Sequence, residues 1–117
     1  MKGILILAHG SREKETEKTF EAVVNMVRDK VEEPMEIAYM EFSKKNIASG
    51  LQQLVDSGVK EVKVVPYFLF SGIHIREDIP AELDAFSKEH PDVTISMADT
   101  LGADPRIAEI LLDRIRS

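Results

Sequence analysis

The stretch KGILILAHGSR, residues 2–12, begins as a continuous aliphatic run and ends in His9, Gly10, Ser11 and Arg12. Such a run is typical of a parallel-sheet strand that is covered on both faces. In open parallel sheets, ligands bind beyond the carboxyl ends of the strands. The stretch therefore predicts a buried first strand with a functional turn at its end.

The rest of the chain alternates short β-rich runs with longer segments of helical period. After the first strand, at residues 2–8, we expect strands at 35–40, 61–70 and 93–98. The spacing of apolar residues predicts helices over 13–31, from Ile47 to a stop at Gly58, from near Asp78 to before Pro91, and from Pro105 onward. The last of these helices has Asp104 as its expected N-cap.

This order, βαβαβαβα, predicts one α/β domain over residues 1–117. Its expected core is an open, parallel, four-stranded sheet with helices on both faces and the strand order 2-1-3-4. Pro66 cannot donate to a strand ladder, so we expect an irregularity or a strand end near it.

Composition excludes several classes of protein. The net charge of −6 argues against a nucleic-acid partner, which would need a basic face. The chain has no cysteine, which excludes disulfides and thiolate metal sites and agrees with a reducing cytoplasm. No apolar run is long enough for a signal peptide or a membrane span, so we expect a cytoplasmic protein without a membrane partner.

The turn after the first strand can hold an acid. Gly10 indicates a tight turn with a close backbone approach, and the helix that follows offers free N–H groups, with Arg12 and Lys14 nearby. His9 stands beside this turn as a candidate ligand or base. A packed or helix-capping histidine is the plain alternative.

Two further side chains follow the next strands. Glu41 ends the second predicted strand, and His74 lies in GIHIRED after the third. With the strand order 2-1-3-4, both converge with His9 on one edge of the sheet. Two imidazoles and one carboxylate with open coordination positions suit a transient or catalytic metal site. The plain alternatives are a loop histidine and a solvated turn glutamate; His90, at a helix end, is interpreted as structural.

Four segments together resemble the short form of the CbiX family, the sirohydrochlorin cobaltochelatases among the class II tetrapyrrole chelatases. They are LILAHGSR (5–12), MEF (40–42), PYFLFSGIHIREDIP (66–80) and DTLGADPRIAEIL (99–111). The pattern G-x-H-x-x-x-D-I-P is the most specific part. The resemblance implies that His9 and His74 are the metal and proton-transfer residues and that Glu41 is their acidic partner. SKKNI departs from the pattern, because we expect a proline before the helix there.

The resemblance also implies a function. The expected enzyme is a lyase that inserts a divalent metal into sirohydrochlorin for cobalamin-type cofactors, with no organic cofactor. The resemblance favours cobalt as the metal, with nickel or iron as alternatives. Family members of about twice this length carry two such units, so a homodimer with a shared cleft is expected. The residues expected to hold the acidic ring are Gly10, Ser11, Arg12, Lys44, Lys45, Ser71, Gly72 and Arg76.

Other functions remain open at this point. A phosphocarrier domain of a sugar phosphotransferase system would use His9 as phosphoryl acceptor and would need no role for His74. A tetrapyrrole-binding protein without catalysis is a second alternative. A phosphatase would need an arginine where Ala8 stands, and a receiver domain would need paired carboxylates after the first strand.

Overall fold

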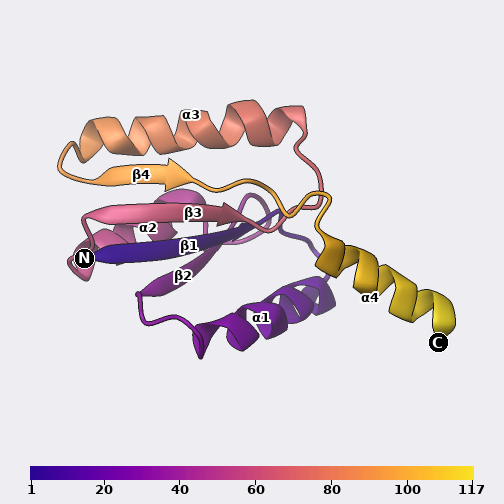
Figure 1. The fold of residues 1–117 in the computed structure, drawn as a ribbon. Helices are drawn as coiled ribbons and strands as arrows, with labels where there is room; N and C mark the ends of the chain where they lie inside the picture. The colour runs from indigo at the N-terminus through magenta and orange to yellow at the C-terminus, as the bar shows by residue number, and fades with distance from the viewer.

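The computed structural model describes the backbone of residues 1–117 and every side chain except that of His74. Strands and helices alternate along the chain (Figure 1). The elements are β1 (Lys2–Ala8), α1 (Lys14–Arg28), β2 (Met35–Tyr39), α2 (Ile47–Asp56), β3 (Glu61–Pro66), α3 (Ile73–Glu89), β4 (Thr94–Met97) and α4 (Pro105–Arg116).

The four strands form one parallel sheet in the order β2-β1-β3-β4. The predicted fold class and strand order are therefore confirmed. β1 lies between β2 and β3, and Ile6 is in register with Ile37 on one side and Val65 on the other. A strand hydrogen-bonded on both sides and covered on both faces has no polar surface, which is why its sequence is aliphatic throughout.

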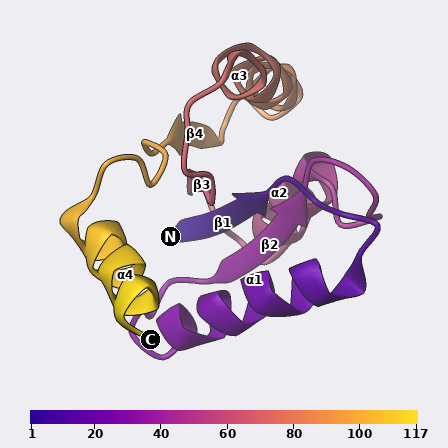
Figure 2. The same cartoon turned by 90° about the vertical axis from the view of Figure 1, so that its right-hand side faces the viewer.

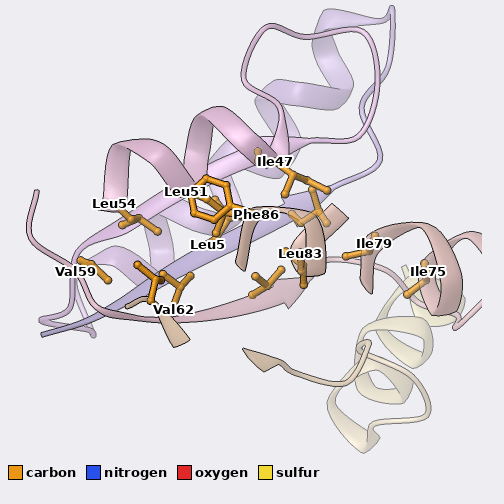
Figure 3. Close-up of a cluster of buried hydrophobic side chains, with 14 residues drawn as sticks. Leu5, Ile47, Leu51, Leu54, Val59, Val62, Ile75, Ile79, Leu83 and Phe86 are labelled. Atoms are coloured by element: carbon orange, nitrogen blue, oxygen red, sulfur yellow. The ribbon is translucent and has the colours of Figure 1, made fainter. Parts of the chain in front are cut away.

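Alternate side chains of β1 enter two separate cores. Leu5 and Leu7 are fully buried among the residues of α2 and α3, in the larger core that Figure 3 shows. Ile6 and Ala8 point to the other face, where Phe20 and Val24 of α1 cover them. Figure 2 shows this division, with α2 and α3 on one side of the sheet and α1 and α4 on the other.

The third strand is shorter than predicted. β3 ends at Pro66, so residues 67–70 form a loop and not the second half of a strand. The irregularity expected at this proline is confirmed as a strand end. Proline has no N–H to donate to a neighbouring strand. The Tyr67 N–H still donates to the Leu7 carbonyl at 2.7 Å, and the chain then continues as a loop.

The third helix begins earlier than predicted, at Ile73 and not near Asp78. His74 and Arg76 therefore lie in the first turns of a helix and not in a loop. The structure places Pro80 in the interior of α3. A proline is favourable in the first turn of a helix but costs stability in its interior. Burial of an apolar stripe outweighs that cost: Ile75, Ile79, Leu83 and Phe86 all pack into the larger core.

The remaining boundaries agree with prediction to within a few residues. Gly58 stops α2 with a φ of +98°, and its N–H donates to the Val55 carbonyl at 3.0 Å. Asp104 caps α4 by accepting from the Arg106 N–H at 2.9 Å, with Pro105 at the first helical position. Within the described part of the chain, no helix combines the length and apolar character that crossing a membrane requires.

Candidate active site

His9 and Glu41 lie side by side because β1 and β2 stay paired beyond their last strand residues. The Met40 N–H donates to the Ala8 carbonyl at 3.0 Å, and the Glu41 N–H donates to the His9 carbonyl at 3.0 Å. This continued pairing brings the turns after β1 and β2 together, and the side chains of His9 and Glu41 meet there. The pair is thus positioned by backbone hydrogen bonds at the carboxyl edge of the sheet.

The two side chains face each other across a short gap that is open to solvent. His9 Nε2 lies 3.8 Å from Glu41 Oε2, and the side chains are 60% and 52% exposed. The edge of the imidazole meets Phe68, with ring centroids 6.2 Å apart and planes at 88°. The arrangement presents one nitrogen and one carboxylate ligand to solvent. Both are suitable ligands for first-row divalent metals.

Gly10 lets the turn that contains His9 pack closely against the turn that contains Glu41. Its φ is +94°, and an added Cβ would lie 2.1 Å from the Glu41 carbonyl oxygen. A side chain there would meet backbone and could not rotate away. The close approach predicted for Gly10 is therefore confirmed, and only glycine fits it.

Ser11 and Arg12 face neighbouring turns. The Ser11 hydroxyl oxygen accepts from the Glu13 N–H at 3.0 Å, immediately before α1 begins. The Arg12 guanidinium lies over the Phe42 ring, 4.9 Å from its centroid. This cation–π contact leaves the guanidinium at the surface. Arg12 is three residues after His9 in the sequence, and Phe42 directly follows Glu41.

The turn after Glu41 is the segment where the sequence departs from the family pattern, and the structure gives its conformation. Phe42 has a φ of +58°, unusual for a bulky residue, and the Ser43 hydroxyl oxygen accepts from the Lys45 N–H at 3.1 Å. Asn46 then caps α2 by accepting from the Ser49 N–H at 2.9 Å. An asparagine cap thus starts the helix where a proline was expected. Lys44 and Lys45 are exposed on this turn.

The segment with the second histidine starts from the same edge. His74 is the second residue of α3, which follows β3 through the loop that contains Phe68. The side chain of His74 lies outside the described residues, so its predicted meeting with His9 stays a prediction. Gly72 caps α3, its carbonyl accepts from the Arg76 N–H at 3.1 Å, and Ser71, Gly72 and Arg76 are all exposed.

The described side chains bring together part of the predicted metal set. His9 and Glu41 form a pair, and among the described residues no group of three His, Asp or Glu side chains is arranged to hold a metal. The third predicted ligand is His74, which is not among those residues. The cationic residues Arg12, Lys44 and Lys45 lie on the turns that follow β1 and β2, and Arg76 lies near the start of α3, which follows β3.

Helix N-termini offset the negative charge of the protein at this edge. Each of α1, α2 and α3 follows a parallel strand, so each begins at the carboxyl edge of the sheet (Figure 1). The free N–H groups and the positive dipole end of a helix favour anions. An acidic ligand therefore meets a locally favourable field, although the chain carries a net charge of −6.

Exposed apolar side chains, here called the apolar rim, lie on the segments that follow the carboxyl ends of the strands, and the sequence analysis missed them. Phe70 is 80% exposed and Ile73 is 64% exposed, both next to the start of α3. The rim residues are Phe42, Leu69, Phe70, Ile73 and Leu101. The sequence predicts Phe70 at the end of a strand over 61–70, because an apolar run does not tell which of its residues reach solvent. Pro66 was the signal that could have placed Phe70 in a loop.

Behind His9 lies a pocket of about 400 Å³, between α1 and the sheet. The aromatic rings of Phe20, Tyr39 and Tyr67 line it, with Phe20 in contact with both tyrosines. The Tyr39 hydroxyl is buried and has no hydrogen-bond partner among the described residues. Burial, with the nearby charges of Glu21 and Glu17, raises the pKa of Tyr39 to about 12. Tyr39 thus contributes a neutral phenol beside the site, which sequence reasoning did not identify.

Comparisons with known proteins all match this chain to the same family. The family model described as CbiX matches residues 3–117. A sirohydrochlorin cobaltochelatase of Methanothermobacter thermautotrophicus is 32% identical, over 98% of this chain and 91% of the relative. A sirohydrochlorin ferrochelatase of Priestia megaterium is 28% identical, over 98% of this chain but only 44% of the relative.

Solved structures share the fold. A cobalamin biosynthesis CbiX protein from Marinobacter aquaeolei VT8 superposes with a TM-score of 0.86 at 33% identity, over 99% of this chain and 95% of the other. The sirohydrochlorin chelatase SirB from Bacillus subtilis subspecies spizizenii, in complex with cobalt, gives a TM-score of 0.92 at 27% identity. This chain covers half of that SirB chain, with 98% of its own length aligned.

The Gly10 contact predicts a large difference between two glycine substitutions. Gly10→Ala should lower the free energy of unfolding by about 2 kcal/mol or more, because its Cβ would meet the Glu41 carbonyl at a positive φ. Gly72→Ala is the matched control: it has open space around it and a φ of −89°. It should change stability by less than about 1 kcal/mol. Urea unfolding followed by circular dichroism measures both, and equal losses would contradict the assignment.

Tyr39 predicts an alkaline loss of stability. The folded protein keeps the phenolic proton up to a pKa of about 12, whereas an unfolded chain releases it near 10. Between these pH values the unfolded state binds fewer protons, so stability falls as the pH rises. Unfolding measured from pH 9 to 12 should show a component of this fall that Tyr39→Phe removes and Tyr67→Phe retains. An identical pH profile in all three proteins would contradict the burial of this hydroxyl.

Proposed function

The chain belongs to the CbiX family, and on that premise we propose that it inserts a divalent metal ion, with cobalt as the first candidate, into sirohydrochlorin. The observation that carries the proposal is the open His9–Glu41 pair at the carboxyl edge of the sheet, with Nε2 and Oε2 3.8 Å apart. Relatives that match nearly the whole chain bear the name of this activity.

The metal is a substrate and must be held loosely. A nitrogen and a carboxylate oxygen bind a divalent ion while most of its coordination positions remain open. Because the side chains of His9 and Glu41 are more than half exposed, the ion can keep several waters and later exchange them for ring nitrogens. His74 is the proposed third ligand. A closed set of four protein ligands would suit a structural ion and would oppose transfer.

Metal insertion also requires two N–H protons to leave the ring. A neutral imidazole that is not bound to the metal can accept such a proton, and His9 and His74 are the proposed residues for metal binding and proton removal. The buried phenol of Tyr39 keeps its proton well above neutral pH and is not a base for this step. The division of labour between the two histidines follows from which of them the metal occupies.

The ring itself is flat, apolar on its faces and acidic at its periphery. The apolar rim matches its faces, and Phe70 offers the largest exposed surface. Gly10, Ser11, Arg12, Lys44, Lys45, Ser71, Gly72 and Arg76 are the proposed contacts for its carboxylates. Arginines bind carboxylates with two parallel hydrogen bonds, and the starts of the helices add backbone N–H donors.

We further propose that the working form is a cytoplasmic homodimer with no organic cofactor. One unit offers a single edge to a ring that has two faces. The relatives from Priestia megaterium and Bacillus subtilis are about twice as long as the matched region, which supports a second unit opposite the first. The cysteine-free composition agrees with a reducing compartment.

The phosphocarrier alternative assigns only His9 a role. It leaves the Glu41 partner, the apolar rim and the second histidine without a function. Phosphorylation of His9 by a phosphotransfer protein, unaffected by His74→Ala, would support that alternative. Binding of sirohydrochlorin without faster metal insertion would support an escort role.

Histidine substitutions test the chemistry. His9→Ala and His74→Ala should each lower the rate of cobalt insertion, followed by sirohydrochlorin absorbance, by about a hundredfold or more. The wild-type rate should also fall from pH 8 to pH 5, where imidazoles ordinarily take up a proton.

His90→Gln is the matched control, because His90 stacks on Phe86 at the far end of α3, with ring centroids 4.1 Å apart. Its rate should match the wild type within about twofold. Wild-type rates in either alanine variant, with the fold retained, would overturn the proposed mechanism. So would a rate that does not change between pH 8 and pH 5.

The rim predicts a binding effect. Phe70→Ser should raise the KM for sirohydrochlorin by about tenfold and leave stability unchanged, because Phe70 is exposed in the free protein. Met26→Ser is the control: Met26 is 68% exposed on α1, away from the rim. An equal effect of both variants, or none in Phe70→Ser, would show that the rim does not bind the ring.

A further inference from the structure

Phe42 has a backbone conformation that phenylalanine ordinarily avoids. With a φ of +58°, it is the one non-glycine residue of the described chain in the left-handed region. That region suits glycine and asparagine, whereas a bulky side chain there costs free energy. The Phe42 side chain is 52% exposed, so burial in a core does not offset the cost. Strain of this kind collects at functional sites, and it indicates a role for the Phe42 ring.

The Phe42 ring supports the guanidinium of Arg12. The guanidinium carbon lies over the ring, 4.9 Å from its centroid, which is within the range of a cation–π contact. Among the described residues, no carboxylate or carbonyl forms an ion pair or hydrogen bond with this guanidinium. Arg106, by contrast, is paired with Asp104 at 2.7 Å. The ring contact is thus the interaction that holds the Arg12 side chain in the free protein.

The position of Phe42 is fixed by the backbone on both sides of it. Before it, the Glu41 N–H donates to the His9 carbonyl at 3.0 Å. After it, the Lys45 carbonyl accepts from the Tyr39 N–H at 2.7 Å, which closes the turn that follows β2. The turns after β1 and β2 lie next to each other at the carboxyl edge (Figure 2). The contact between Arg12 and Phe42 therefore joins the two turns that position the His9–Glu41 pair.

A guanidinium supported in this way is prepared to bind a carboxylate. Its five N–H donors lie in its plane, so a ring over one face leaves the donors free to form two parallel hydrogen bonds. A long, unsupported side chain at the surface loses rotamer freedom when it binds a ligand. The Phe42 ring restricts Arg12 before the ligand arrives, which reduces that entropic cost of binding.

We infer that Phe42 is a positioning residue, which holds the Arg12 guanidinium ready to bind a carboxylate at the periphery of the tetrapyrrole ring. The inference rests on the proposed function and adds to it that Phe42 acts mainly through Arg12, more than by its own packing on the ring. It accounts for the positive φ of Phe42, because that conformation places the aromatic face under the guanidinium. Asparagine at this position would relax the backbone and lose the support.

The first test replaces the aromatic face. Phe42→Asn suits a positive φ and should keep the midpoint of urea unfolding, yet raise the Kd for metal-free sirohydrochlorin, titrated by absorbance, by about tenfold. Phe42→Leu keeps an apolar side chain without an aromatic face and should bind the ring as weakly as Phe42→Asn. Phe42→Tyr keeps the aromatic face and should bind within about twofold of the wild type.

The second test is a double-mutant cycle with Arg12. Arg12→Ala should also raise the Kd for sirohydrochlorin by about tenfold. Once Arg12 is gone, adding Phe42→Asn should raise the Kd by less than about a further twofold, because residues that act as one unit are not additive. Phe70→Ser is the matched control: Phe70 belongs to the apolar rim but follows β3, so its effect should multiply with that of Arg12→Ala.

The outcomes separate this inference from the proposed function. Full multiplication of the Phe42→Asn and Arg12→Ala effects would show that Phe42 contacts the ring directly, and would overturn the inference. So would wild-type affinity in Phe42→Leu, and both results would leave metal insertion standing. Wild-type protein that does not bind sirohydrochlorin would overturn the inference and the proposed function together. The insertion rates of the histidine variants are measured separately and test the chemistry alone.

Discussion

The parallel pairing of β1 with β2 and β3 is the constraint on which the site depends. It places the ends of these strands at one edge, and two further backbone hydrogen bonds carry the β1–β2 pairing on to His9 and Glu41. Gly10 then packs directly on the Glu41 carbonyl. The positions of the two side chains are therefore set by main-chain geometry, while the side chains themselves remain exposed.

The same topology explains how an acidic protein can offer a site to an acidic ring. Parallel strands require crossover helices, and every such helix starts at the edge where the strands end. The helix N-termini therefore gather at the site, the turns add Arg12, Lys44 and Lys45, and the start of α3 adds Arg76. In the proposed function, this local charge and the apolar rim would bind the ring, although the whole chain carries a net charge of −6.

The sequence predicted the parts of the molecule that follow from periodicity and turn chemistry. The aliphatic run of β1, the glycine stop of α2 and the Asp-Pro start of α4 each have a local physical cause, and all are confirmed. The start of α3 was wrong because packing of Ile75 and Ile79 overrides the local preference of Pro80. The exposure of Phe70 and the burial of the Tyr39 hydroxyl depend on tertiary position, which a local pattern does not contain.

The way the His9–Glu41 pair is held bears on ion selectivity. Its roots are rigid, but neither side chain is enclosed by packed neighbours, so a change in ionic radius requires only small torsional adjustments. If it binds the metal as proposed, such a pair would discriminate weakly between neighbouring first-row ions. Relatives that match nearly all of this chain are named cobaltochelatases in some organisms and ferrochelatases in others, which agrees with this expectation. If the pair binds the ion as proposed, the supply of the ion, more than the geometry of the pair, would decide which metal reaches the ring.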